Sequence, residues 1–271
     1  MLSIPFVKHD CIMKKLTTNL KTALITTCLL SIFTPLAQAE TQASSLSYNL
    51  SLTSDYRYRG ISQTRLDPAL QGGLDYADNQ AGWYLGAWGS SIKWIKDTPG
   101  AGSTPLEIDV YGGKKFQINE KVSYDLGVLA YYYANNRLDQ IGNKNANTLE
   151  FYGQINYGPA YLKYSQAVTP LFGINDSRNS YYLDLGSNIE LGSGYTLNLH
   201  AGYQKVKGLN DSAASYQDYK VGVSKTLTEA GDWSLALAAH KTTADRNFYA
   251  SPANGKFMGK NALVLSLTKT F

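Results

Sequence analysis

The end of the chain alternates strictly between apolar and polar residues. Leu263, Leu265, Leu267 and Phe271 share one side of a segment with a repeat of two. Such a repeat indicates a β-strand with one face in an apolar medium. A terminal aromatic residue on a strand of this kind is typical of outer-membrane barrels, whose assembly machinery reads the last strand. The segment therefore predicts a transmembrane strand in the outer membrane of a Gram-negative bacterium, with the assembly machinery as a partner.

Residues 1–39 have the pattern of a leader that is removed on export. Two lysines follow Met13, an apolar run covers 23–36, and residues 37–39 (Ala-Gln-Ala) form a small-x-small cleavage site. No targeting pattern precedes Met13, so we expect it to be the true start. The prediction is a cleaved leader over 1–39 and one outer-membrane barrel over 40–271.

Removal of this leader changes what the composition allows. Both cysteines, Cys11 and Cys28, lie in it, which leaves the exported chain without disulfides or thiolate metal sites. The leader also holds four lysines and Asp10, so its loss brings the formal net charge from +4 to +1. A chain this close to neutral gives no reason to expect nucleic acid as a partner. We expect no metal and no cofactor.

The same alternation recurs along the rest of the chain. Near Leu197, for example, Tyr195 and Leu199 oppose Thr196 and Asn198. Twelve strands are expected over 47–58, 69–77, 82–90, 106–116, 121–133, 147–157, 159–166, 180–189, 195–203, 216–226, 232–240 and 261–271.

The connections between these segments alternate between long and short. The long ones are 59–68, 91–105, 134–146, 167–179, 204–215 and 241–260, and each short one has at most five residues. Short periplasmic turns and long extracellular loops are characteristic of bacterial outer-membrane barrels. The expected fold is all-β: a single closed antiparallel transmembrane β-barrel of about 12 strands with both termini in the periplasm.

Aromatic residues gather near both ends of the expected strands. Near the periplasmic ends lie Tyr48, Tyr76, Trp83, Tyr157, Tyr195, Trp233 and Phe271. Near the outer ends lie Tyr58, Tyr132, Tyr164, Tyr181, Tyr203 and Tyr219. Two such belts at the lipid–water boundaries support a spanning barrel.

The densest local signature is residues 54–63 (Ser-Asp-Tyr-Arg-Tyr-Arg-Gly-Ile-Ser-Gln), followed by residues 67–76 (Asp-Pro-Ala-Leu-Gln-Gly-Gly-Leu-Asp-Tyr). Residues 86–90 and 107–113 continue it. Together with the closing strand, these segments resemble the TorF-like family of porins, long catalogued as conserved bacterial proteins of unknown function. The resemblance spans essentially the whole exported chain. It implies an outer-membrane barrel that forms a channel, and it supplies no catalytic residues and no defined solute.

Charged residues on the inward faces are the expected pore lining. Asp55 and Arg57 are two apart on one expected strand, so they point to the same side, either as part of a charged constriction or as a structural ion pair. The candidate pore-lining residues are Asp55, Arg57, Asp75, Glu107, Asp109, Asp125, Glu150, Lys163, Asp184, His200, Asp218 and Lys220. Acids outnumber bases among them, which favours cations unless carboxylate–base pairs cancel the field.

The lumen and the loops leave two further points open. Inward Tyr131, Tyr152, Tyr161 and Tyr182 are expected to narrow the lumen, which is then poorly conducting or plugged. The long loops are rich in bases such as Arg59. These bases either steer anionic solutes or contact the phosphates of lipopolysaccharide, an expected partner along with the membrane lipid.

The function expected from these features is passive or mildly selective diffusion of small hydrophilic solutes or ions through an outer-membrane channel. A non-conducting structural or surface-binding barrel is the first alternative. An outer-membrane hydrolase that uses His200 or His240 is the second. The sequence has no Gly-x-Ser-x-Gly elbow and no compact serine–histidine signature, so we do not expect an enzyme.

Overall fold

The computed structural model of the protein describes residues 44–208, 211–227 and 232–271. Twelve strands form a closed antiparallel barrel in which each strand pairs with its neighbours along the chain. The first strand, β1 (Ser44–Thr53), closes the barrel by pairing with the last, β14 (Ala262–Thr270). The expected leader, and part of the turn expected after Leu227, lie outside the described residues.

The remaining elements follow in order. The other barrel strands are β4 (Ala69–Asp78), β5 (Trp83–Ser91), β6 (Leu106–Gln117), β7 (Val122–Tyr132), β8 (Thr148–Tyr157), β9 (Ala160–Ala167), β10 (Tyr181–Gly192), β11 (Tyr195–Lys205), β12 (Tyr216–Leu227) and β13 (Trp233–Thr242). A separate two-stranded hairpin is formed by β2 (Arg57–Tyr58) and β3 (Ile61–Ser62). The helical turns are α1 (Trp94–Asp97), η1 (Leu138–Ile141), η2 (Leu171–Gly173) and α2 (Asp211–Ala214). None of the helices in the described ranges has the length and apolar character needed to cross a membrane.

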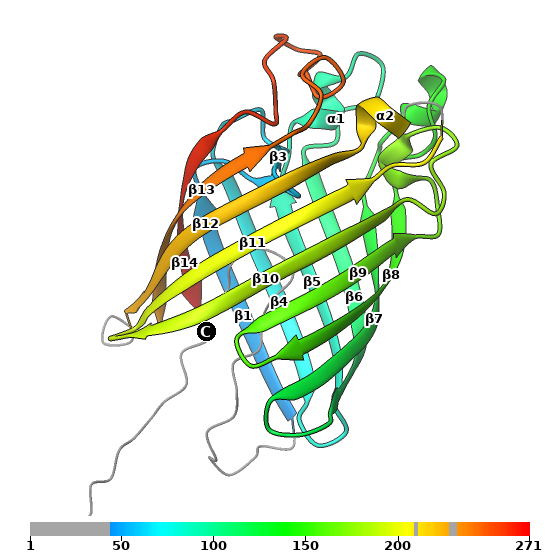
Figure 1. Ribbon diagram of the computed structural model, residues 1–271. Coiled ribbons are helices and arrows are strands. Elements are labelled where there is room, and N and C mark those ends of the chain that lie inside the picture. The colour runs from blue at the N-terminus through cyan, green and yellow to red at the C-terminus, as the bar shows by residue number, and fades with distance from the viewer. Residues whose placement is uncertain (1–43, 209–210, 228–231) are drawn as a thin grey trace, which may run out of the picture.

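Long and short connections gather at opposite ends of the barrel. The strands run at a steep tilt, and the long connections with the helical turns lie together at one end, called the loop end below (Figure 1). The opposite end, called the turn end, carries the short connections and the C-terminus (Figure 1). The prediction of a closed twelve-stranded antiparallel barrel is confirmed.

The outer face of the barrel is apolar. Leucines such as Leu85 and Leu263 are exposed there, and polar residues alternate with them toward the interior. Of the aromatic residues expected near the periplasmic ends, all except the half-buried Trp233 are exposed, among them Tyr48, Trp83 and Phe271. A wall of this kind places an apolar band against lipid and a polar surface inside.

The first expected strand is wrong beyond Thr53. β1 ends at Thr53, which pairs directly with Ala69 of β4, so residues 54–68 leave the wall. We call these residues the plug segment, because they fold into the interior. Tyr58, expected in the outer aromatic belt, belongs to this segment and not to the wall. The alternation that runs through Tyr56 and Tyr58 is that of a hairpin packed inside the barrel, which has the same repeat of two as a wall strand.

The plug segment also continues the seam between β1 and β14. The seam itself has five paired positions, from Asn49↔Thr270 to Thr53↔Ser266, whereas β1 and β4 have ten. Beyond these pairs, the Ser54 amide donates to the Leu265 carbonyl at 2.8 Å. Farther up, the Ser62 amide donates to the Met258 carbonyl at 3.0 Å.

Candidate channel lumen and its plug

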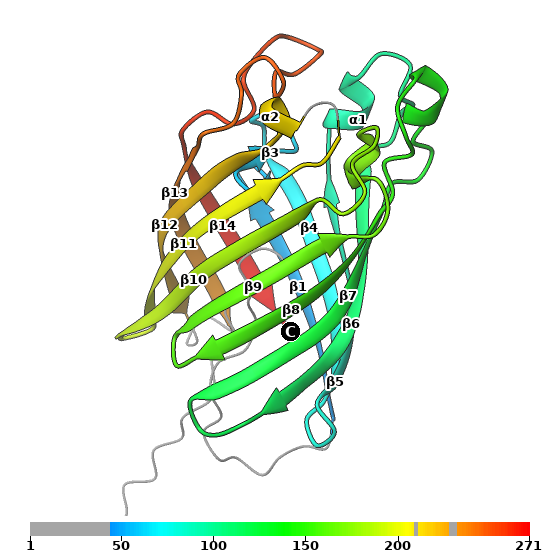
Figure 2. The same cartoon turned by 45° about the vertical axis from the view of Figure 1, so that its right-hand side comes forward.

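The hairpin of the plug segment crosses the interior near the loop end. The Tyr56 hydroxyl donates to Glu107 of β6 at 2.5 Å. Arg59 donates to Glu150 of β8 and to Gln204 of β11, each at 2.7 Å. Figure 2 shows β3 behind β11–β13, just below the loops. Contacts to strands so far apart around the ring mean that the segment bridges the lumen.

Gly60 at the tip of the hairpin completes this bridge. Its φ of +79° suits glycine, and a Cβ atom there would lie 2.6 Å from Cγ2 of Thr242 and 2.7 Å from Cβ of Asp218. Thr242 ends β13 and Asp218 lies on β12, so the hairpin tip is seated directly against this side of the wall.

Asp55 and Arg57 form an ion pair, but they do not lie on a wall strand as expected. The Arg57 Nε donates to Asp55 at 2.8 Å, and its Nη1 donates to the carbonyls of Gly60 at 3.0 Å and Lys260 at 2.8 Å. The Ser62 hydroxyl donates to the same aspartate at 2.5 Å. The pair thus links residues within the plug segment and joins it to the loop before β14, as expected for the structural alternative.

Glu107 joins the plug segment to the loop above it. The hydroxyl of Tyr133, which follows β7, donates to Oε2 of Glu107 at 2.6 Å, while the Tyr56 hydroxyl donates to Oε1 of the same carboxylate. Burial, and next the charge of Glu107, raises the pKa of both Tyr56 and Tyr133. Both phenols therefore stay protonated and remain donors to this carboxylate.

Arg59 is enclosed by polar and aromatic groups and does not belong to the basic loop surface expected from the sequence. It is 7% exposed, and its guanidinium lies 4.3 Å from the ring centroid of Tyr182 and 4.8 Å from that of Tyr58. Burial opposes its charge, but the Glu150 carboxylate outweighs burial and raises the pKa of Arg59. The side chain is a buried, permanently charged anchor.

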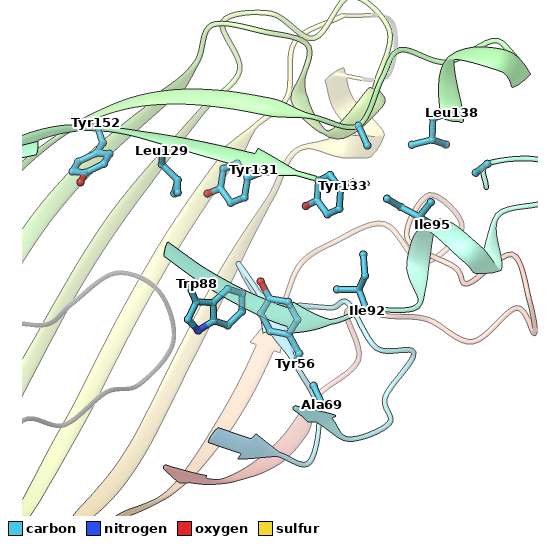
Figure 3. Close-up of a cluster of buried hydrophobic side chains, with 12 residues drawn as sticks. Tyr56, Ala69, Trp88, Ile92, Ile95, Leu129, Tyr131, Tyr133, Leu138 and Tyr152 are labelled. Carbon is cyan, nitrogen blue, oxygen red and sulfur yellow. The ribbon is translucent and has the colours of Figure 1, made fainter. Parts of the chain in front are cut away.

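The loops form a packed cap over the plug segment. Tyr131 and Tyr133 point from the end of β7 into the interior, toward Tyr56 and Trp88 (Figure 3). Tyr56 packs edge-on against Trp88 at 5.4 Å, and Ile95 of α1 joins the same cluster. Two smaller clusters join Ile61 to the loop before β14 and Leu171 to the loop after β11. The loop end is thus a small hydrophobic core, and several loop bases in it are already paired: Arg65 with Asp97, Lys93 with Asp67 and Lys205 with Asp211.

A polar cluster of the lumen lies on β10–β12. The two ring nitrogens of His200 lie 2.8 Å from carboxylate oxygens of Asp184 and Asp218. Tyr182 donates to Asp218 at 2.8 Å. Carboxylates accept at both nitrogens, which suits the doubly protonated ring. Among the described residues, no serine is hydrogen-bonded to His200, so this arrangement lacks the nucleophile of a serine hydrolase.

A second polar cluster lies on the side formed by β5–β9. Tyr84 donates to Asp125 at 2.6 Å and is also hydrogen-bonded to Tyr152. The Lys163 ammonium lies 3.6 Å from the centroid of the Tyr152 ring. This cluster therefore places one acid, Asp125, and one base, Lys163, on the same side of the lumen.

Inward tyrosines lie against inward glycines of the neighbouring strand. Gly186 is paired with Tyr161, and a Cβ at this glycine would lie 2.4 Å from the ring of Tyr161. The same direct pairing joins Gly86 with Tyr111, Gly113 with Tyr84 and Gly127 with Tyr152. These rings therefore lie along the wall and narrow the lumen less than the sequence suggests.

The opposite side of the lumen is lined by small side chains. Inward positions of β13, β14 and β1 carry Ser234, Ala236, Ala238, Ala262, Ser266, Thr268, Ser47, Asn49 and Ser51, with the larger Val264 and His240 toward the loop end. The widest passage below the plug segment is expected along these strands, because the bulk and the charge lie across from them.

The other candidate residues lie on wall strands with their side chains on the inward face. These are Asp75 on β4, Glu107 and Asp109 on β6, Asp125 on β7, Glu150 on β8, Lys163 on β9, Asp184 on β10, His200 on β11, and Asp218 and Lys220 on β12. The structure gathers Glu107, Asp109 and Glu150 under the plug segment, and Asp184, His200 and Asp218 beside it. Among the described residues, no group of three or more His, Cys, Asp or Glu is arranged to hold a metal ion.

Tyr56, Arg59 and Gln204 belong to this site but are not among the residues expected from the sequence. The expected strand over 47–58 puts Tyr56 on the lipid side, opposite to Asp55 and Arg57, and Arg59 lies in an expected loop. One signal was available: Gly60 directly after Arg59 is a turn residue inside what otherwise reads as an outer loop.

By its fold the protein is a twelve-stranded porin-type barrel. A KdgM porin in complex with disordered oligogalacturonate is similar to it, with 10% identity, a TM-score of 0.51, and coverage of 84% of this chain and 99% of that chain. A NanC porin is similar with 11% identity and a TM-score of 0.51, covering 83% of this chain and 98% of that chain. At these identities the likeness concerns the fold alone.

The sequence matches, over residues 37–271, a family described as bacterial protein of unknown function (Gcw_chp), and the chain belongs to this family. No match was found among curated protein sequences.

Proposed function

We propose that this protein is an outer-membrane channel for small hydrophilic solutes or ions, closed at its loop end by the plug segment. One observation carries the proposal: the barrel has an apolar outer face and an interior lined with charged and small polar side chains. Such a wall suits a polar passage through lipid. The porin-type fold supports this function, as does the resemblance to the TorF-like porins.

In this setting the termini lie in the periplasm and the loop end faces outward. The loop bases outside the ion pairs named above are then positioned to contact lipopolysaccharide phosphates, and the strand that ends at Phe271 is the one the assembly machinery reads. No catalytic role is assigned to any residue.

The test is conductance in planar bilayers, with the plug segment as the variable. Thr53 and Ala69 are directly paired, so residues 54–68 can be replaced by Asn-Gly, the preferred two-residue hairpin turn. We expect rare, brief openings of the natural protein and steady current through the variant. A gel-mobility shift on heating reports that the variant is folded.

A matched control shortens a different loop at the same end. Residues 252–255 form an exposed turn, closed by a 2.8 Å bond from the Ser251 amide to the Lys256 carbonyl, and Asn-Gly can replace them. This control should conduct like the natural protein. If the folded plug-replaced barrel is silent at every voltage, the channel is wrong, and a non-conducting surface-binding barrel takes its place.

A further inference from the structure

The surroundings of Arg59 have the form of a binding site occupied by a group of the protein itself. Glu150 and Gln204 accept hydrogen bonds from its guanidinium, and the rings of Tyr58 and Tyr182 lie beside it. We call Glu150, Gln204 and Tyr182 the cation cage, because all three belong to the wall and remain when Arg59 leaves. A carboxylate, an amide oxygen and an aromatic face are the groups that bind guanidinium and ammonium ions.

Buried carboxyl oxygens without hydrogen-bond partners lie beside the cage and within it. Asp109 is fully buried on β6, and neither of its carboxyl oxygens has a hydrogen-bond partner among the described residues. Oε1 of Glu150, a member of the cage, has none either. Lys163 of β9 interacts electrostatically with Glu150 but also with Asp125 and Asp184. The site therefore offers free acceptors to a cationic group that carries several N–H donors.

We propose that the cation cage recognises a transported solute bearing a guanidinium or primary ammonium group, and that this solute opens the channel by displacing Arg59. The proposal rests on the proposed channel function. Displacement is a competition between a free and a tethered cation, because the plug segment stays joined to β1 and β4 at both ends. A tethered group has an effective concentration in the millimolar range, so the free solute competes at similar concentrations.

Solutes of other charge do not meet the same conditions. An anion brings no donor for the unpartnered oxygens of Asp109 and Glu150, and the Glu150 carboxylate repels it. A neutral sugar has no charge to replace that of Arg59, so it would leave Glu150 buried without a counter-charge. The KdgM porin is described in complex with an oligogalacturonate, which is anionic. The lining at the loop end of the present barrel favours the opposite charge.

The first measurement is single-channel recording with probes added on the loop side. L-argininamide is the cationic probe, and urea and glutamate are the neutral and anionic controls. We expect millimolar L-argininamide to raise the fraction of time that the natural protein is open by about tenfold, which corresponds to about 1.4 kcal/mol. Urea and glutamate should leave it unchanged. An equal effect of all three probes would overturn the proposal.

The second measurement uses variants of the cage. Arg59→Ala should raise the open fraction without any probe, and L-argininamide should then interrupt the current by binding in the cage. Arg65→Ala, which removes a charge from the same segment but outside the cage, should respond to the probe like the natural protein. Glu150→Gln should raise basal opening and remove the response. If Arg59→Ala does not fold, Arg59→Gln gives the same comparison.

The outcomes separate this inference from the proposed function. A silent plug-replaced barrel overturns both. The cation site alone is overturned if the plug-replaced barrel conducts but Arg59→Ala does not behave as expected. That is the case if Arg59→Ala opens no more often than the natural protein, or if L-argininamide never interrupts its current.

Discussion

At the loop end, the interior is filled by the plug segment, whose Tyr56 is 1% exposed, under a cap of packed loops. At the turn end, the interior is bordered by short side chains such as Ser47 and Ala236 on one side and by tyrosines laid along the wall on the other. The wall has the same architecture at both ends. The difference shows that the lumen is obstructed at the loop end by an insertion in the first hairpin, while the wall around it is unchanged.

The largest effect is expected from removing one anchor of the plug segment. Tyr56→Phe keeps the ring against Trp88 but loses the hydrogen bond to buried Glu107. A bond to a charged group contributes about 1.5–3 kcal/mol. The open fraction in bilayers should therefore rise by about tenfold to a hundredfold. Tyr48→Phe, on the exposed outer face, is the control and should change nothing. Equal opening in both variants would show that this contact does not hold the plug segment.

The next largest effect is expected at the turn end, once the plug segment has been replaced by Asn-Gly. In this background Ala236→Trp puts a large ring into the passage along the small side chains, and single-channel conductance should fall by about half or more. Leu237→Trp, one position along the same strand and facing lipid, should conduct as before. A similar loss in both would mean that the passage does not follow β13.

A smaller effect is expected from the pairing of tyrosine with glycine. In the same background, Gly186→Ala forces the ring of Tyr161 away from the wall, since the new Cβ would lie 2.4 Å from it. Overpacking of this kind costs about 1–3 kcal/mol, so thermal stability and conductance should both fall. At Gly153, which faces outward, the nearest side-chain atom is 3.3 Å away, and Gly153→Ala should be tolerated. Unchanged conductance in Gly186→Ala would show that Tyr161 does not border the passage.

The smallest effect is a dependence of closure on pH. The hydrogen bond from Lys93 lowers the pKa of Asp67, at the end of the plug segment. A lowered folded-state pKa means that this contact is present above about pH 4 and is lost as the pH falls through the folded-state value. The aspartate is 47% exposed, so the contribution is below about 1 kcal/mol.

Acid should therefore raise the open fraction only slightly. At pH 7, Asp67→Asn should already show the part of this rise that comes from loss of the contact between Asp67 and Lys93. Asp211→Asn, which breaks a similar pair away from the plug segment, should leave the open fraction unchanged. A rise of the same size in this control would assign the pH response to the loops in general.

Most of the wall could be predicted from the sequence. Each strand has lipid on one side and a polar interior on the other, which requires apolar and polar residues to alternate. The strands after the first agree with β4–β14 to within a few residues. Alternation cannot show, however, whether the apolar residues face lipid or pack in a buried cluster. Tyr56 and Tyr58 continue the repeat of Leu50 and Leu52 but pack inside the barrel.

The contacts of the site were less predictable. Inward carboxylates such as Glu107 and Glu150 could be identified, because a period of two assigns every second residue to the lumen. Their partners could not, since Tyr56, Arg59 and Gln204 come from segments that meet only when the plug segment folds inward. A single sequence indicates whether a strand residue faces the lumen or the lipid, but it does not indicate the path of a segment that has left the wall.

The short seam has a mechanical consequence. β1 and β14 share only five paired positions, and above them the wall is fastened by contacts of the plug segment, such as Ser62 with Met258 and Arg57 with Lys260. Outward movement of the segment would break these contacts. Unblocking the lumen would therefore also loosen the seam between β1 and β14, so that the two changes are coupled.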